Sequence, residues 1–228
     1  MHLTEATRGA FSLLFSGDPA LWEIVWVSLK TSTVALFIAT PGAIVVGYGM
    51  AAHKFRGRRI AIWLTQASLS LPTVMIGLLL YLLLSRQAPL GGLQWLFTQS
   101  GIIFGQALIA TPVLVAFTLA AVQAADVRIA ETAVTLGASR WRTMVTVLHE
   151  VRFGVMAAII SGFGRVIAEV GSAIMVGGNI EGQTRTITTA IALETSKGEF
   201  AQGIALGIVL LTIALIINAL LMILQGDA

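Results

Sequence analysis

The sequence contains no cysteine and few charged residues. The absence of cysteine excludes a disulfide framework, a zinc site with Cys ligands, an iron–sulfur cluster and thiol catalysis. Of the 228 residues, only 11% are charged and 57% are hydrophobic. A water-soluble domain of this size needs a polar exterior, which 14 basic and 11 acidic side chains are too few to provide. The composition therefore indicates a protein that resides in a lipid bilayer.

Long apolar segments supply the predicted membrane spans. A hydrocarbon core of about 30 Å needs about 20 apolar residues in a helix that rises about 1.5 Å per residue. Five segments reach that length: residues 21–52, 60–84, 102–122, 153–176 and 204–224. We therefore expect an all-α polytopic membrane protein with five transmembrane helices, in which residues 19–225 form one transmembrane domain.

The N-terminal residues 1–18 are predicted to form an interfacial segment. Residues 3–15 are too short to cross the membrane, and their apolar positions fit a helix that lies along the membrane surface. Asp18 followed by Pro19 is typical of a helix N-cap and the first helical turn, so the first span is expected to begin there.

Basic residues predict the orientation of the chain. They cluster after the first span and between the third and fourth spans, in loops that fall on the same side of the membrane; the residues are Lys54, Arg56, Arg58 and Arg59, and Arg128, Arg140, Arg142 and Arg152. Short loops rich in Lys and Arg are cytoplasmic. We therefore expect the N-terminus outside and the C-terminus in the cytoplasm. The net charge of +3 follows this topology and forms no single patch, so no nucleic-acid partner is expected.

Proline falls inside three of the apolar segments. Pro41, Pro72 and Pro112 each remove a backbone donor and are expected to bend their helices. Neighbouring helices in a membrane bundle can satisfy the carbonyls that such a bend frees.

A polar segment at residues 126–142 interrupts the apolar spans. Apolar residues recur at helical spacing from Arg128 to Leu136, and Gly137 is placed to end that helix in a left-handed cap. Ser139 can then cap a second short helix through Trp141. Two helices joined by a tight turn form a compact knob on the cytoplasmic face. The alternative is a helix that lies on lipid headgroups.

Two opposite charges lie inside the predicted fourth span. Arg165 and Glu169 are four residues apart, so they share a helix face and can contact each other. Arg165 lies about 20 Å above Arg152 along a helix, within the hydrocarbon zone. A charge at that depth costs roughly 2.5–3.5 kcal/mol on insertion scales, so both side chains should face the bundle interior or a wet cavity. One hypothesis is that Arg165 supplies positive potential along an anion path; the other is that the pair locks the span to its neighbours.

Two further patterns fail to form sites. The segment from Gly177 to Thr184 superficially echoes a phosphate-binding loop, but Gln183 replaces the required Lys. His2, His53 and His149 have no second ligand at metal spacing. We therefore expect a chain that is not an enzyme, binds no cofactor or metal, and has no ATP site of its own.

The knob resembles the coupling motif of type I ABC-transporter permeases. Glu131-Thr-Ala133 followed by Gly137, after three spans and before two more, resembles the Glu-Ala-Ala and Gly pattern of that family. The family motif ends in Ile-x-Leu-Pro, whereas this chain has Val147-Leu148-His149-Glu150. By this resemblance the knob docks on a cytoplasmic ATPase, and ATP-driven closure of two ATPases moves the permease between inward- and outward-facing states. The resemblance assigns coupling to Glu131, Ala133, Leu136, Gly137, Ala138, Ser139, Arg140 and Trp141.

A second block resembles the branch of that family that imports molybdate, tungstate and sulfate. It comprises Gly164-Arg165-Val-Ile-Ala-Glu169-Val-Gly171 and Gly178-Asn179-Ile-Glu-Gly182-Gln-Thr184-Arg185-Thr186. Within the branch, His149-Glu150-Val-Arg152-Phe-Gly154 and Ala192-Leu193-Glu194-Thr195-Ser196-Lys197-Gly198 look most like tungstate permeases.

The resemblance implies a function and a set of partners. The chain is expected to be a permease subunit in a prokaryotic plasma membrane that imports an oxyanion, tungstate first, with molybdate or sulfate as alternatives. Two partner ATPases would bind ATP and Mg, and an extracytoplasmic binding protein would deliver the anion. Five helices are too few to enclose a gated path, so we predict a homodimer. A stand-alone channel or secondary carrier is the alternative class, but five spans are few for a carrier with two repeats.

The same branch draws attention to the outer segment, residues 177–200. Asn179, Thr184 and Arg185 are placed to meet an oxyanion at the mouth or a docking receptor protein, since backbone amides, hydroxyls and Arg all bind such anions. With Arg165 and Glu169 they make up the predicted substrate path. The alternative is a solvated loop with a short helix over residues 187–194.

Overall fold

The computed structural model describes residues 3–225, and within that range every regular element is a helix. The elements are α1 (Leu3–Ser16), α2 (Pro19–Ala52), α3 (Arg58–Leu69), α4 (Thr73–Leu84), the short 3-10 helix η1 (Gly91–Leu93), α5 (Gln99–Ala124), α6 (Val127–Thr135), α7 (Arg140–Glu150), α8 (Arg152–Ile167), α9 (Gly171–Gly177), α10 (Ile187–Lys197) and α11 (Phe200–Gln225). The predicted all-α class is confirmed. Residues 1 and 2 of the predicted N-terminal segment, including His2, lie outside the described residues.

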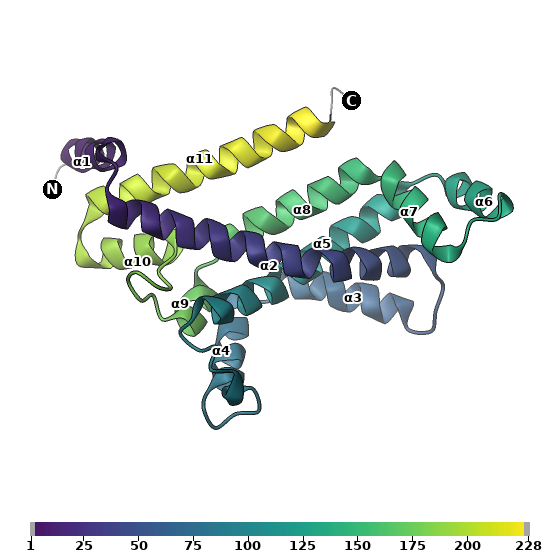
Figure 1. Ribbon diagram of the computed structural model, residues 1–228, viewed down its shortest axis with the longest axis horizontal. Helices are drawn as coiled ribbons and strands as arrows, with labels where there is room; N and C mark the ends of the chain where they lie inside the picture. Colours follow the sequence, from purple (N-terminus) through teal and green to yellow (C-terminus); the bar gives the residue numbers. More distant parts are fainter. Residues whose placement is uncertain (1–2, 226–228) are drawn as a thin grey trace.

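Several long helices run along the long axis of the molecule. In Figure 1, α2, α3, α5 and α8 lie along this axis, and α6 and α7 stand at one end while α1 and α10 stand at the other. Helix α5 is central, because it packs against both α2 and α8. Helix α4 points away from the axis (Figure 1). The two basic loops, which precede α3 and surround α6 and α7, therefore share one end of the molecule, as predicted.

Three helices are long and apolar enough to cross a membrane: α2, α5 and residues Phe200–Leu220 of α11. Two pairs of helices, α3 with α4 and α7 with α8, meet the same criteria only when each bent pair is taken as one span. By length and composition, the described part of the chain therefore has three to five candidate spans. The predicted number of five is its upper limit.

The predicted span over residues 60–84 is not one helix. Helix α3 ends at Leu69, α4 begins at Thr73, and the two helices are bent by 99°. Pro72 lies at the break with an extended backbone, φ −62° and ψ 119°, because its ring and missing N–H prevent the helix from continuing. The expected bend at Pro72 is confirmed, and it is a complete break. Pro41 and Pro112 lie inside the continuous helices α2 and α5.

The predicted span over residues 153–176 is also broken. Helix α8 ends at Ile167 and α9 begins at Gly171, so Glu169 lies in the connection between them. The sequence of this stretch is apolar on both sides of the break, which is why hydropathy alone predicted a single helix.

The helix start at Asp18 agrees with the prediction. Pro19 is the first residue of α2, and the carboxylate of Asp18 accepts a hydrogen bond from the backbone N–H of Ala20 at 2.8 Å. Because the first N–H groups of a helix have no partner inside the helix, this side chain satisfies one of them.

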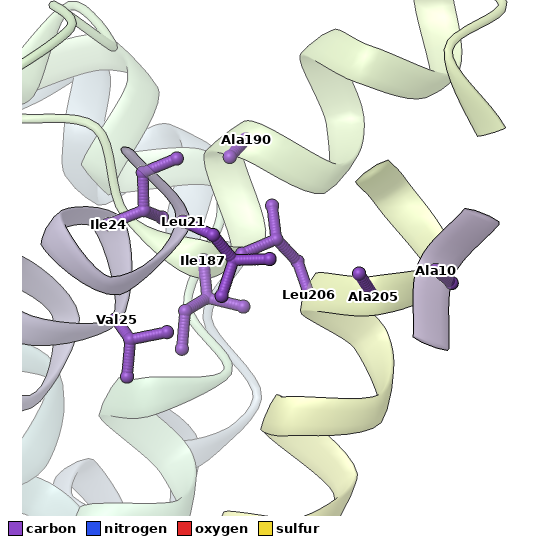
Figure 2. Packing of buried hydrophobic residues seen from close by; sticks show 8 residues of the cluster. All are labelled: Ala10, Leu21, Ile24, Val25, Ile187, Ala190, Ala205 and Leu206. Carbon is purple, nitrogen blue, oxygen red and sulfur yellow. The ribbon is translucent and has the colours of Figure 1, made fainter. Parts of the chain in front are cut away.

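At the other end of the molecule from the knob, four helices share an apolar cluster. Figure 2 shows Leu21 of α2, Ile187 of α10 and Leu206 of α11 directed toward one another, with Ala10 of α1 beside Ala205. Leu21, Ile187 and Leu206 are each at most 1% exposed. This cluster attaches the predicted interfacial helix α1 to the end of α11.

Helices α2 and α5 approach closely at Gly47. A Cβ at this position would lie 2.8 Å from Thr118 Cβ and 2.9 Å from the carbonyl oxygen of Val115. We expect Gly47→Val to destabilise the protein by about 1–3 kcal/mol, because overpacking forces the two helices apart. Gly49→Val is the control, since a Cβ on Gly49 has no neighbour within 4 Å. Thermal unfolding in detergent should show a lower Tm for the first variant alone; equal melting of both variants would contradict this account of the contact.

Candidate functional site

The predicted knob is present and consists of α6, a tight turn and α7. A side chain caps the N-terminus of each helix. Asp126 caps α6 and accepts a hydrogen bond from the N–H of Arg128 at 2.9 Å, and Ser139 caps α7 and accepts one from the N–H of Arg142 at 3.4 Å. The turn has the left-handed glycine that the sequence predicts, with φ of +82° at Gly137. The N–H of Gly137 donates to the carbonyl of Val134, and that of Ala138 to Ala133, each at 2.9 Å. These paired bonds make a Schellman cap, which needs the left-handed residue.

The knob presents apolar side chains to its surroundings. Leu136 is 82% exposed, Trp141 66% and Val134 61%. A groove of about 530 Å³ runs between α6 and α7; its lining includes Ala133, Leu136 and Ala138 and is flanked by Arg128 and Arg142. Exposed apolar residues rimmed by polar ones are typical of a surface that contacts another protein or a membrane.

The knob is anchored to the spans by a small apolar cluster. Met144 and Val147 of α7 are buried against Tyr48 of α2 and Val122 of α5. A second cavity of about 400 Å³ lies beside this cluster, and Glu131 lines it together with Lys54, Arg58 and Asp126. Glu131 therefore lies on the side of α6 that faces the spans, whereas the groove lies between α6 and α7.

A substitution in the turn tests the role of its backbone. Gly137→Ala keeps open space around the new methyl group but places an L-residue at positive φ, which costs roughly 1–2 kcal/mol. Gly198→Ala is the matched control, because Gly198 caps α10 with φ of +83° and also has no neighbour within 4 Å. If the knob couples to an ATPase, Gly137→Ala should reduce transport-linked ATP hydrolysis by about fivefold to thirtyfold, the factor that corresponds to this strain energy, and Gly198→Ala should not. Equal losses in both variants would contradict a specific role for the turn.

The charged pair of the broken span is formed as predicted. Arg165 Nη1 lies 3.2 Å from Glu169 Oε2, although Glu169 is beyond the end of α8. The Glu169 side chain is 2% exposed and that of Arg165 is 38% exposed. Glu169 Oε1 also accepts from the N–H of Ser172 at 3.0 Å, and the Glu169 carbonyl accepts from Thr188 Oγ1 at 2.7 Å. Glu169 thus joins α8, α9 and α10 at the break.

A cavity of about 570 Å³ opens beside Arg165. Its lining residues come from α2, α3, the start of α4, α5 and α8, and its walls are mostly aliphatic. Among the residues that line it, Arg165 alone carries a charge. Sequence analysis missed this cavity because five separate elements enclose it.

The three outer residues of the predicted path, Asn179, Thr184 and Arg185, contact other residues of this chain. Thr184 is 1% exposed, and its hydroxyl donates to the Gly177 carbonyl at 2.6 Å and accepts from the N–H of Ile180 at 2.9 Å. Asn179 Nδ2 donates to the Thr189 carbonyl at 3.3 Å. Arg185 pairs with Glu181 at 3.3 Å, and its side chain is 12% exposed. None of the three makes a hydrogen bond or ion pair with Arg165 or Glu169 in the described residues.

The segment that precedes α10 is therefore folded against the body of the protein. Thr186 and Thr189 form a reciprocal capping box, and the N–H of Ile187 donates to Ser28 Oγ of α2 at 2.7 Å. The expected helix over residues 187–194 is confirmed and continues to Lys197. The expectation of a solvated loop is wrong for Thr184, because these contacts bury its side chain.

In the part of the chain that the structure describes, no group of three His, Asp or Glu side chains is placed to hold a metal ion. Arg165 is paired with Glu169, and Arg128 and Arg142 line the groove of the knob. The arrangement offers a contact surface at one end and, in the body, a cavity lined by the side chain of Arg165.

Comparisons with known proteins agree with this geometry. A family model described as "Binding-protein-dependent transport system inner membrane component" matches residues 43–226. The chain is 35% identical over 226 residues to a tungstate uptake system permease protein from Peptoclostridium acidaminophilum, and the match covers 99% of each chain. It is 30% identical over 192 residues to a molybdenum transport system permease protein from Escherichia coli K12, covering 80% of this chain and 83% of the relative.

A solved structure shares the fold. In the crystal structure of a bacterial alginate ABC transporter in complex with an alginate-bound periplasmic protein, one chain matches with a TM-score of 0.73 at 19% identity. The match covers 92% of this chain and 80% of the other.

Proposed function

Because the chain belongs to the family of binding-protein-dependent transport system inner membrane components, we propose that it is the permease subunit of an ATP-driven importer for a tetrahedral oxyanion, with tungstate as the substrate. The observation that carries this choice is the match along 99% of both chains to a tungstate uptake permease. The match to a molybdenum permease covers less of the chain at lower identity, so molybdate is the second candidate.

The exposed knob supports coupling to a separate motor. Leu136 and Trp141 leave apolar surface at the end of the molecule where the basic loops lie, which is the cytoplasmic end by the positive-inside rule. In this proposal two ATPase subunits, which bind ATP and Mg, each bind the knob of one of two copies of this chain. The chain itself contributes no catalytic residue, and its N-terminus is outside while its C-terminus is cytoplasmic.

The remaining assignments follow from the same proposal. An extracytoplasmic binding protein delivers the oxyanion to the end formed by α1 and α10, in the plasma membrane of a prokaryote. The pore lies between the two copies, with Arg165 and Glu169 beside it. Asn179 and Arg185 are kept as outer residues of the path; the buried hydroxyl of Thr184 supports a structural role there.

Reconstituted transport tests the proposal. The chain, co-expressed with an ABC ATPase and an oxyanion-binding protein from the same organism, is placed in proteoliposomes. Uptake of isotopically enriched tungstate is measured by mass spectrometry, with unlabelled tungstate, molybdate or sulfate as competitor. We expect uptake that requires ATP and all three proteins and that tungstate inhibits best. Uphill accumulation by this chain alone would overturn the proposal and support a secondary carrier, and best inhibition by molybdate would overturn the choice of anion.

A further inference from the structure

We propose that the cavity beside Arg165 is a transient binding site for the oxyanion within the membrane, in which Arg165 and Thr73 are the donors and Glu169 is a positioning residue. This inference rests on the proposed function, because it assumes that a tetrahedral dianion passes through the protein. The proposed site lies on the inner side of the break between α8 and α9, where the anion would bind for a time during transport.

The depth of the cavity fits this role. Arg165 is the thirteenth residue after Arg152, where α8 begins, so it lies about 20 Å along the helix. Met50 and Ala61, near the cytoplasmic ends of α2 and α3, also line the cavity. The cavity therefore extends from the inner ends of the helices to the guanidinium. Its volume of about 570 Å³ leaves room for an anion with bound water, since one water occupies ~30 Å³ in the liquid.

The charge of Arg165 is only partly used by its ion pair. A guanidinium has five N–H donors, and a single hydrogen bond from Nη1 to Glu169 is present. The Glu169 side chain is 2% exposed, and its carboxylate also accepts a hydrogen bond from the N–H of Ser172. The Arg165 side chain is 38% exposed. Glu169 is therefore buried, and its ion pair fixes the position of the more exposed Arg165 side chain. The remaining donors are available to a tetrahedral oxyanion, which accepts paired hydrogen bonds from Arg.

The other polar groups of the cavity supply one more donor. The hydroxyls of Thr65, Ser68 and Thr111 donate to carbonyls of their own helices. Thr73, at the start of α4, lines the same cavity and its hydroxyl has no partner in the described residues. Most of the wall is aliphatic, and a wall of low dielectric constant extends the reach of a single positive charge.

The absence of native cysteine permits a direct test of this charge. Thr111→Cys places a thiol in the cavity, and Thr40→Cys places one in a groove of about 290 Å³ that no charged residue lines. The two positions are matched, because each Thr precedes a proline within a long helix and donates to the carbonyl four residues earlier. The complete complex with its ATPase, in nanodiscs, is treated separately with an anionic and a cationic methanethiosulfonate reagent. The thiolate forms a disulfide and methanesulfinate leaves.

The measured quantity is the ratio of the anionic to the cationic modification rate. This ratio cancels differences in thiol ionisation, because both reagents react with the same thiolate. We expect a ratio about tenfold higher at Thr111→Cys than at Thr40→Cys, which is the low end of electrostatic focusing in charged clefts. Adding Arg165→Gln should lower the ratio to the control value or below it, because the Glu169 carboxylate, once unpaired, repels the anionic reagent. Millimolar tungstate should slow modification at Thr111→Cys alone, and Thr73→Val should weaken that protection.

The outcomes separate this inference from the proposed function. Equal ratios at the two positions, or a thiol at 111 that neither reagent reaches because lipid fills the cavity, would overturn the inference even if ATP-driven tungstate uptake is normal. Protection by tungstate that persists in Arg165→Gln would also overturn it. Absence of tungstate uptake by the wild-type complex would overturn the proposed function instead. If Thr111→Cys fails to assemble, Ser68→Cys reports on the same cavity from α3.

Discussion

Leu136→Asp is expected to lower ATP-driven uptake by about a hundredfold, the factor that corresponds to roughly 2.8 kcal/mol at 1.4 kcal/mol per factor of ten. Leu136 is 82% exposed at the tip of the knob and lines the groove between α6 and α7. A charge there must be desolvated when the knob docks, and the few hot-spot residues of an interface each contribute about 2 kcal/mol or more. Because the side chain is exposed, folding of the permease itself should not change.

Val127→Asp is the matched control for this prediction. Val127 is 68% exposed and begins the same helix, but it lies outside the groove, and an acidic residue in the first turn of a helix is favourable. Co-purification with the ATPase and uptake in proteoliposomes are the measurements. Retention of ATPase binding and uptake in Leu136→Asp would show that the knob is not the docking surface and would favour the alternative in which it lies on lipid headgroups.

Arg165→Gln is expected to reduce uptake by a similar factor, about a hundredfold, while membrane insertion and ATPase binding remain intact. Gln keeps a polar side chain but removes the only charge that lines the cavity. The partner carboxylate keeps its hydrogen bond from Ser172 and, once unpaired, repels an anion. Arg86→Gln is the control, because it removes one positive charge from the connection after α4, away from this cavity.

Glu169→Gln distinguishes the two explanations of the ion pair. If the pair only locks α8 to its neighbours, both single substitutions should impair assembly to the same degree, since each leaves a group without its partner. If Arg165 supplies charge to the path, Glu169→Gln should retain much more uptake than Arg165→Gln, because the amide can still accept from Ser172 while the guanidinium remains. Uptake and size-exclusion profiles of the two variants decide between these outcomes.

Close approaches between helices explain where the fold departs from the predicted spans. A Cβ on Gly77 of α4 would lie 2.7 Å from Ser172 Cα, so α4 packs directly on the backbone of α9. This contact lies between two segments that hydropathy assigned to single continuous spans, residues 60–84 and 153–176. The helices that follow the two breaks, α4 after the α3–α4 break and α9 after the α8–α9 break, therefore pack against each other.

Local chemistry was sufficient to predict the elements whose partners are close in sequence. The start of α2 at Asp18, the left-handed Gly137, the cap at Ser139 and the contact between Arg165 and Glu169 all involve residues at most five positions apart. Composition likewise determined the membrane class, because so apolar a chain has too few charged side chains to cover a soluble domain.

Only the tertiary structure decided which polar residues are buried and which face a cavity. Thr184 is polar in a Gly-rich segment, yet it is 1% exposed in a segment that folds against α2, where the N–H of Ile187 donates to Ser28 Oγ. Glu169 is buried because Ser172 and Thr188 satisfy its oxygens, while Arg165 reaches the cavity between α3, α4 and α5. Hydropathy records how apolar a segment is, but hydrogen bonds and close packing between distant segments determine where a helix ends and which face meets water.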